Sequence, residues 1–239
     1  MPAPAADQGV GIDRDVKLLL LHPLPLDGSI FSDDLRSLVD DCAAPTLYSE
    51  GEDLAAWALA ALDAVGDGPV VVVGNSIGGS CAIEVAMLAP TKVKGLVLCG
   101  AKAGHRPEPE LRDEALDVLE CQGIDIAWER YWRPLFGPDA SAAVVEQGWR
   151  TAPKIGAPII AEGVRAFHGR ADREDFLLRW EGSVALVSGE HDRPERSRRL
   201  AELLPHGSFH QIGGVGHYLP LEAPETLTAI TADVLASAT

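Results

Sequence analysis

The chain has 239 residues, of which 46% are apolar, and a formal net charge of −16. This length suits a single α/β domain, or one core with an inserted segment. Nucleic acids and anionic membranes are bound by Lys and Arg that neutralise phosphates, so the charge argues against both as partners. The sequence contains neither an apolar run of the about 20 residues that span a membrane nor an obvious secretory signal, so we expect a cytoplasmic protein.

Strands and helices are expected to alternate after a Pro/Ala/Asp/Gly-rich tail at residues 1–15. Short apolar runs predict strands, which are buried because both of their faces are apolar. Between these runs, helical spacing of apolar residues predicts helices. This alternation indicates a parallel sheet with helices on both faces. The expected strands are 16–21, 43–49 (weaker), 70–73 and 92–100, and the expected helices are 27–39, 52–65 and 77 to about 89.

Residues 105–180 differ from the rest, because they contain helical stretches and no convincing strand. Strand character returns at 183–189, followed by a helix at 195–204, a short strand at 208–212 and a final helix from about Pro220. We interpret residues 105–180 as a helical lid inserted into one core. The core then consists of residues 16–104 and 181–239.

A serine flanked by glycines follows the valine run. In "VVVVGNSIGG", Ser76 lies between Gly74 and Gly78, where a strand is expected to meet a helix. Gly-x-Ser-x-Gly at such a junction is the nucleophile elbow, a tight turn that exposes the serine hydroxyl above the sheet. A Cβ at either glycine would collide with the neighbouring strand or helix. A phosphate-binding loop would need Gly-Lys-Ser/Thr, and this segment has no lysine. We therefore predict that Ser76 is a catalytic nucleophile.

A serine nucleophile needs a base to take its proton, and the base needs a carboxylate to orient it. Of the seven histidines, His217 is the one in a glycine-rich loop between the last strand and the last helix, "GGVGHYLP". We predict that His217 is the base and that Asp192, which follows a strand in "SGEHDRPE", is the carboxylate that orients it. Glu190, two residues earlier, is the competing candidate for the carboxylate. The chain order Ser76, Asp192, His217 is typical of one architecture that uses this triad.

Two backbone N–H groups are expected to form an oxyanion hole. One belongs to Ile77, directly after the serine. The other belongs to Leu24, since Pro23 and Pro25 on either side of it have no N–H. The prolines should stiffen this loop and so favour preorganisation. His22 is interpreted as a structural residue that bonds within the loop.

The lid is expected to select the substrate. The stretch "IDIAWERYWRPLF" places large apolar residues on one helical face, which could line an apolar pocket, pack the lid onto the core, or do both. These candidate substrate-binding residues are Trp128, Tyr131, Trp132 and Leu135. Four lid arginines could hold a substrate carboxylate, but a solvated position on the helix surface is the interpretation we favour: Arg130, Arg133, Arg150 and Arg165.

The four cysteines form no CxxC pair and no metal-binding spacing with histidine. We expect them to be reduced thiols, and we expect neither a metal site nor a cofactor. Cys81 lies close to Ser76 but inside an apolar helix, which predicts a packed thiol and not a nucleophile.

Together, the motifs "GNSIGG", "SGEHDRPE" and "GGVGHYLPLEAPE" resemble the α/β-hydrolase superfamily, within its small, lidded members, over residues 16–237. The arrangement of "GRADREDFL" before "SVALVSGEHD" is similar to the bacterial 3-oxoadipate enol-lactonase and carboxylesterase branch. The resemblance implies the α/β-hydrolase fold, with a mostly parallel sheet, helices on both faces and an inserted helical lid.

Two departures from the family pattern are visible. His22-Pro23 stands where His-Gly is usual, and the customary N-terminal hairpin is missing, as in members similar to the menaquinone-pathway SHCHC synthase. Epoxide hydrolases and haloalkane dehalogenases are similar overall, but they carry Asp at the nucleophile position, so Ser76 argues against both.

The predicted function is hydrolysis of a small, largely apolar carboxylic ester, lactone or thioester through an acyl-enzyme. Two alternatives stay open. One is a lyase, cyclase or C–C bond hydrolase that uses the same triad as acid and base, because the fold alone does not choose the chemistry. The other is a non-catalytic ligand receptor. The expected partner is a small-molecule substrate, and the sequence leaves the oligomeric state open.

Overall fold

The computed structural model describes residues 15–238, so all of the predicted tail except Asp15 lies outside the described residues. Within them, six strands form one sheet in the order β2–β1–β3–β4–β5–β6, and every neighbouring pair is parallel. The predicted parallel sheet is therefore confirmed. The strands are β1 (Lys17–Leu21), β2 (Cys42–Ala43), β3 (Val70–Asn75), β4 (Val93–Cys99), β5 (Ser183–Gly189) and β6 (Gly207–Ile212).

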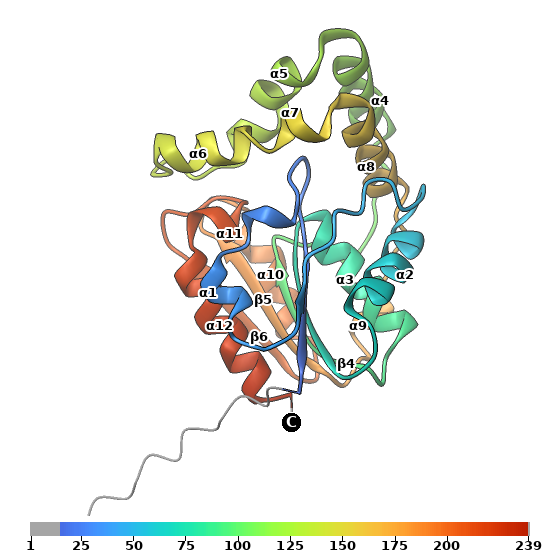
Figure 1. Ribbon diagram of the computed structural model, residues 1–239, viewed down its shortest axis with the longest axis vertical. Coiled ribbons are helices and arrows are strands. Elements are labelled where there is room, and N and C mark those ends of the chain that lie inside the picture. Colours follow the sequence, from blue (N-terminus) through green and yellow to red (C-terminus); the bar gives the residue numbers. More distant parts are fainter. Residues whose placement is uncertain (1–14, 239) are drawn as a thin grey trace, which may run out of the picture.

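Both faces of the sheet are apolar and are covered by other elements. Successive residues of a strand point to opposite sides, so each strand contributes to two separate clusters. In β1, Leu18 and Leu20 join one apolar cluster, and Leu19 and Leu21 join the other. Figure 1 shows the helices that cover the two faces. The first face is covered by α1 (Asp33–Arg36) and α12 (Pro224–Ala236), and the second by α2 (Leu54–Val65), α3 (Ile77–Leu88) and α10 (Pro194–Ala201).

The predicted strand at 43–49 is wrong beyond its first residue, because β2 ends at Ala43. The following segment turns toward the loop after β1 instead of extending the sheet edge. The Leu47 N–H donates to Nε2 of His22 at 3.0 Å, and the Tyr48 hydroxyl donates to the Leu26 carbonyl at 2.7 Å. The first bond uses a backbone donor that a ladder would otherwise need, and the second holds the segment against the loop after β1.

Two of the expected helices are broken into shorter pieces. The segment 27–39 forms a 3₁₀ turn (Gly28–Ile30) and then α1, whose N-cap Ser32 accepts from the Leu35 N–H at 3.2 Å. The final helix is interrupted before Pro224, giving α11 (Leu219–Glu222) and α12. The break at Pro224 follows from the missing N–H of proline.

Between β4 and β5 the chain forms helices and no strand. Figure 1 shows α4 to α8 above the carboxyl ends of the strands, and α9 lower, beside the sheet. Leu177 of α9 joins the core cluster that contains α3. No helix within residues 15–238 is long and apolar enough to span a membrane. The helices are α4 (Pro109–Asp117), α5 (Ile124–Ala127), α6 (Ala142–Trp149), α7 (Ala152–Ile155), α8 (Ala157–Gly169) and α9 (Glu174–Leu177), with π-helical turns at Val118–Gln122 and Trp128–Trp132 and a 3₁₀ turn at Arg133–Leu135.

Candidate active site

The loops that carry the predicted site residues open at one edge of the sheet. Leu21 at the end of β1 pairs with Gly74 of β3, and Cys99 at the end of β4 pairs with Val187 of β5. Because the strands are parallel, the loops that follow them emerge together, beneath the helices α4 to α8 in Figure 1. Residues distant in the sequence are thereby brought to one place.

Ser76 occupies the strained turn that the motif predicts. Its backbone has φ 57° and ψ −118°, a conformation that residues with a side chain rarely adopt. Its N–H donates to the Cys99 carbonyl at 2.8 Å. A Cβ on Gly74 would collide with the Gly78 carbonyl, and a Cβ on Gly78 would collide with the Leu21 carbonyl. The glycines are therefore required by close approach of the backbone.

Asp192 and His217 form a direct pair. Nδ1 of His217 lies 2.7 Å from Oδ2 of Asp192, and the two side chains are only 13% and 20% exposed. An ionised carboxylate is an acceptor, so Nδ1 carries the hydrogen and Nε2 is the nitrogen able to take a proton. This is the geometry that a general base needs.

Gly100, directly after β4, makes room for this pair and was missed by the sequence analysis. It has φ +54°, and an added Cβ would lie 2.5 Å from Oδ2 of Asp192 and 2.9 Å from Nδ1 of His217. A glycine at the end of a predicted strand, in "LVLCGAKAG", was the available signal. The side chains that contact Gly100 belong to Asp192 and His217, on two loops distant in the sequence, so the spacing of the motifs does not identify this glycine.

The backbone of His217 is fixed by two groups outside its own loop. Its N–H donates to the Leu135 carbonyl at 2.8 Å, and its carbonyl accepts from Nδ2 of Asn75 at 3.0 Å. Leu135 belongs to the segment predicted as the lid, and Asn75 immediately precedes the serine. The histidine is therefore positioned relative to both.

Glu222 also fixes the loop that carries His217, residues 213–218, which we call the histidine loop. Its carboxylate accepts from three backbone N–H groups, which belong to Gly137 at 2.7 Å, Tyr218 at 3.0 Å and Gly216 at 3.1 Å. Bonds to a charged acceptor are stronger than those between neutral groups. This carboxylate joins the histidine loop to the chain that follows Leu135, and the sequence analysis did not single it out.

A cavity of about 450 Å³ contains the predicted triad. Ser76, Asp192 and His217 all line it, together with Leu24. Three of the four predicted substrate-binding residues line it as well, namely Tyr131, Trp132 and Leu135. The cavity surface as a whole is mainly apolar, and its other lining residues are Gly100, four apolar residues and four polar ones: Leu111, Ala115, Val164 and Phe167, then Lys102, Glu108, His168 and Arg193.

Trp128 is the predicted substrate-binding residue that does not line this cavity, and its position matches the alternative role of packing. It is 3% exposed, and its ring packs between those of Trp149 and Phe136, with centroids 5.5 Å and 6.0 Å away. The prediction assumed a regular α-helix, whereas the turn from Trp128 to Trp132 is π-helical. The wider i→i+5 turn changes which residues share a face.

The two predicted oxyanion donors lie where a free N–H is expected. Ile77 is the first residue of α3, where helical N–H groups have no partner in their own helix. Within residues 15–238, neither the Ile77 N–H nor the Leu24 N–H donates to another protein group. The Leu24 carbonyl accepts from the Tyr218 hydroxyl at 3.0 Å, which ties this loop to the histidine loop.

His22 is buried and holds the loop after β1, as the sequence analysis predicted. Its Nε2 accepts from the Leu47 N–H, so Nδ1 carries the hydrogen and donates to the Pro23 carbonyl at 3.3 Å. Burial lowers the pKa of His22 to about 4, which keeps the ring neutral. It does not line the cavity.

Other candidates from the sequence lie elsewhere. The Cys81 thiol is fully buried, and burial raises its pKa, so it is an unreactive packed group. Glu190 accepts from the Gly214 N–H at 2.9 Å and supports the histidine loop. The four lid arginines pair with glutamates at the surface: Arg130 with Glu114, Arg133 with Glu129, Arg150 with Glu146, and Arg165 with Glu120 and Glu162. Among the described residues, no group of His, Cys, Asp or Glu could hold a metal ion.

Known proteins share this sequence and architecture to different extents. The chain is 38% identical over 102 residues to the lipase LipV of Mycobacterium tuberculosis, covering 38% of this chain and 39% of LipV. It is 25% identical over 193 residues to a 2-hydroxymuconate semialdehyde hydrolase of a Pseudomonas species, covering 76% of this chain and 67% of that protein. It spans only 11% of the length of a further, much longer relative.

A solved structure with a similar fold is that of a thermophilic esterase from Thermogutta terrifontis. It superposes with a TM-score of 0.81 at 24% identity, covering 91% of this chain and 88% of the esterase. The model of the alpha/beta hydrolase family matches residues 18–230, which is most of the chain. By this match, and by its parallel sheet with helices on both faces, the chain belongs to the α/β-hydrolase family.

Proposed function

We propose that this protein is a cofactor-independent serine hydrolase that cleaves a small, largely apolar carboxylic ester, lactone or thioester. The observation that carries the proposal is the 2.7 Å pairing of His217 with Asp192 in the same cavity as Ser76, whose backbone has a positive φ. The mainly apolar wall of the cavity fits an apolar acyl group.

The proposed mechanism follows from the positions of these groups. The Ser76 hydroxyl attacks the carbonyl carbon, and Nε2 of His217 accepts the hydroxyl proton. The Asp192 carboxylate stabilises the imidazolium that forms. The negative oxygen of the intermediate is held by two N–H groups. One is that of Leu24 in the loop after β1, and the other is that of Ile77, at the positive end of α3. His217 then protonates the leaving group and later activates the water that hydrolyses the acyl-enzyme.

The test combines turnover with covalent labelling. Purified protein should hydrolyse p-nitrophenyl butyrate, and a fluorophosphonate should add one label, located on Ser76 by peptide mass spectrometry. Ser76→Ala should abolish both signals. An intact mass unchanged by the probe, in a protein that is folded by circular dichroism, would remove Ser76 as nucleophile. Tight ligand binding without turnover would favour a receptor.

The second candidate is cleavage of a bond other than an ester, with the triad acting as acid and base. The match to a 2-hydroxymuconate semialdehyde hydrolase favours keeping this second candidate, because the name of that relative's substrate does not refer to an ester. The two chemistries differ in the intermediate. An activated ester should give a burst of nitrophenol equal to the amount of enzyme if an acyl-enzyme accumulates.

A further inference from the structure

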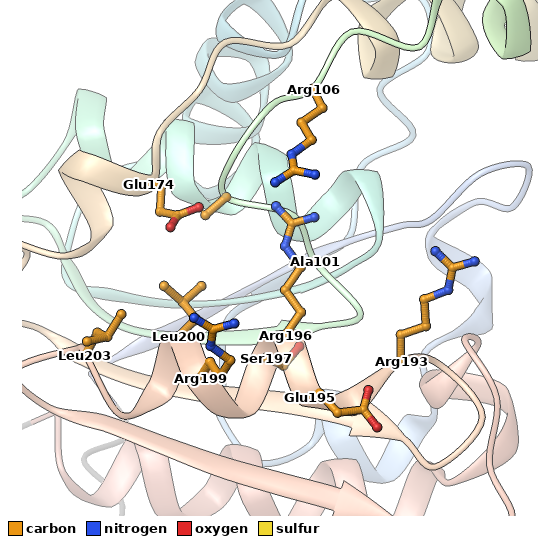
Figure 2. Close-up of a pocket in the computed structure, with 11 residues that line it drawn as sticks. Ala101, Arg106, Glu174, Arg193, Glu195, Arg196, Ser197, Arg199, Leu200 and Leu203 are labelled. Carbon is orange, nitrogen blue, oxygen red and sulfur yellow. The ribbon is translucent and has the colours of Figure 1, made fainter.

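A groove rich in positive charge begins beside the Asp192–His217 pair. This hollow, of about 280 Å³, is lined by both members of the pair and by five cationic side chains: Lys102, Arg106, Arg170, Arg193 and Arg196. Next to it lies a larger hollow of about 510 Å³, which shares Arg106, Arg193 and Arg196 and adds Arg199. Figure 2 shows this second hollow. We call the two hollows together the arginine groove.

Four arginines of this groove have no carboxylate partner among residues 15–238, although the protein has 36 acidic and 20 basic residues. Within the described residues, no ion pair includes them, whereas the four lid arginines are all paired. Carboxylates line the groove too, at Glu108, Glu174 and Glu195, but they form no ion pair with these guanidinium groups. The unpaired side chains are Arg106, Arg193, Arg196 and Arg199.

Like charges face one another in the groove. In Figure 2 the side chains of Arg106 and Arg196 point toward each other from opposite sides of the hollow. Burial lowers the pKa of the Lys102 ammonium, and the nearby cations Arg170, Arg196 and Arg193 lower that pKa further. Repulsion among fixed cations is relieved when an anion binds between them, so the arrangement favours anionic ligands.

The position of the groove suits the leaving group of the substrate. The leaving group takes a proton from His217, so it must lie beside that side chain. The arginine groove starts at His217 and Asp192, whereas the apolar residues Leu111, Val164 and Phe167 line only the cavity. The acyl group therefore fits the apolar cavity, and the leaving group lies toward the arginines.

We propose that the arginine groove binds the phosphate groups of a phosphorylated thiol, so that the substrates are acyl thioesters whose thiol part carries several phosphates, as coenzyme A does. This rests on the proposed hydrolase function. A single carboxylate needs one guanidinium, whereas four unpaired arginines over two adjoining hollows match a group with several negative charges. In the reaction, the carbonyl–sulfur bond breaks, the thiol leaves with the proton from His217, and water then releases the acyl group from Ser76 as a carboxylic acid.

The experiment compares two thioesters with the same acyl group. Butyryl-coenzyme A carries the phosphates, and butyryl-N-acetylcysteamine lacks them; thiol release is followed with a disulfide reagent. Wild-type protein should favour butyryl-coenzyme A in kcat/KM by at least about tenfold, and this preference should fall as salt rises. In the double variant Arg106→Gln/Arg196→Gln the preference should be lost, mainly through KM. Arg150→Gln, a surface arginine paired with Glu146, is the matched control and should keep it.

Binding of coenzyme A itself is measured by calorimetry and does not depend on turnover. Weaker binding to the double variant supports the groove even if the proposed chemistry fails. Equal kcat/KM for both thioesters, or binding of coenzyme A that is unchanged in the double variant, overturns the proposal. A third thioester, S-butyryl-3-mercaptopropionate, carries one carboxylate on the same thiol side and separates the sources of charge: if the double variant loses activity on this thioester but not on butyryl-coenzyme A, the groove binds carboxylates and the phosphate assignment is wrong.

Discussion

Replacing Gly100 by alanine places a methyl group against the Asp192–His217 pair. The new Cβ would lie 2.5 Å from Oδ2 of Asp192 and 2.9 Å from Nδ1 of His217, so the carboxylate or the imidazole must move. We expect the 2.7 Å bond between them to be lost, and with it the orientation of the base. Wrong orientation or tautomer costs up to about 10⁴-fold in kcat in other triads, so kcat should fall by about 10²- to 10⁴-fold.

The same substitution also forces a residue with a Cβ to adopt φ +54°. This strain costs roughly 1–2 kcal/mol of folding stability. In a protein of this size the melting temperature should fall by about 2–8 °C, so the variant should stay folded at 25 °C. The assay is p-nitrophenyl butyrate hydrolysis beside a thermal melt.

Gly66 offers a matched control for backbone strain. It has φ +64°, and the nearest atom to an added Cβ is Nζ of Lys17, at 3.9 Å. With ψ −164°, Gly66 lies in a region that strongly favours glycine, so Gly66→Ala should lower the melting temperature at least as much and leave kcat close to wild type. If Gly100→Ala retains kcat within about threefold while folded, the space at this position does not determine the geometry of the pair, and the reasoning fails.

Three further predictions concern the triad and the buried histidine. Asp192→Asn should cost up to about 10⁴-fold in kcat. Glu190→Gln should be nearly silent, because an amide oxygen can still accept a backbone N–H. Steady-state rates check both, and the reverse pattern would exchange the two assignments. Ser76→Ala and His217→Ala should each cost about 10³-fold or more, and the double variant should cost little beyond that, because both belong to one proton-transfer unit; additive losses in the same assay would contradict a shared unit. His22 has a pKa of about 4 when folded against 6.5 when unfolded, so the unfolded state binds more protons between these values and stability falls as the pH is lowered through them. The loss should reach about 3 kcal/mol near pH 4. Urea unfolding at pH 7 and pH 5 should show this decrease in wild type and a smaller one in His22→Gln, and equal decreases would exclude His22 as its source.

The sequence predicts most of the fold because the strands are buried on both faces. The leucines of β1 and the valines of β3 form continuous apolar runs, which is the pattern of strands buried within a parallel sheet. The prediction was wrong where local pattern and tertiary contacts compete. The segment after Ala43 reads as a strand, but Leu47 and Tyr48 bond to the loop after β1 instead.

The candidate site divides in a similar way. Ser76, Asp192 and His217 are predicted from sequence because each lies in a short motif at the end of a predicted element, and the structure brings the three to one cavity. Gly100 and Glu222 are not found, since their importance depends on which loops meet in space. That Trp128 packs against other rings and does not line the cavity was not predictable either, because a π-helical turn is not visible in the spacing of apolar residues.

The contacts of Glu222 have a consequence for engineering this protein by exchange of its helical segment. A replacement segment from a relative must supply an N–H where Gly137 now donates to Glu222, and a carbonyl where Leu135 now accepts from the His217 N–H. A graft chosen only for the shape of its pocket would leave a partly buried carboxylate short of a donor, and the histidine loop would lose an attachment. Chimeras should therefore be joined outside residues 135–137, so that this short piece of native chain stays with the core.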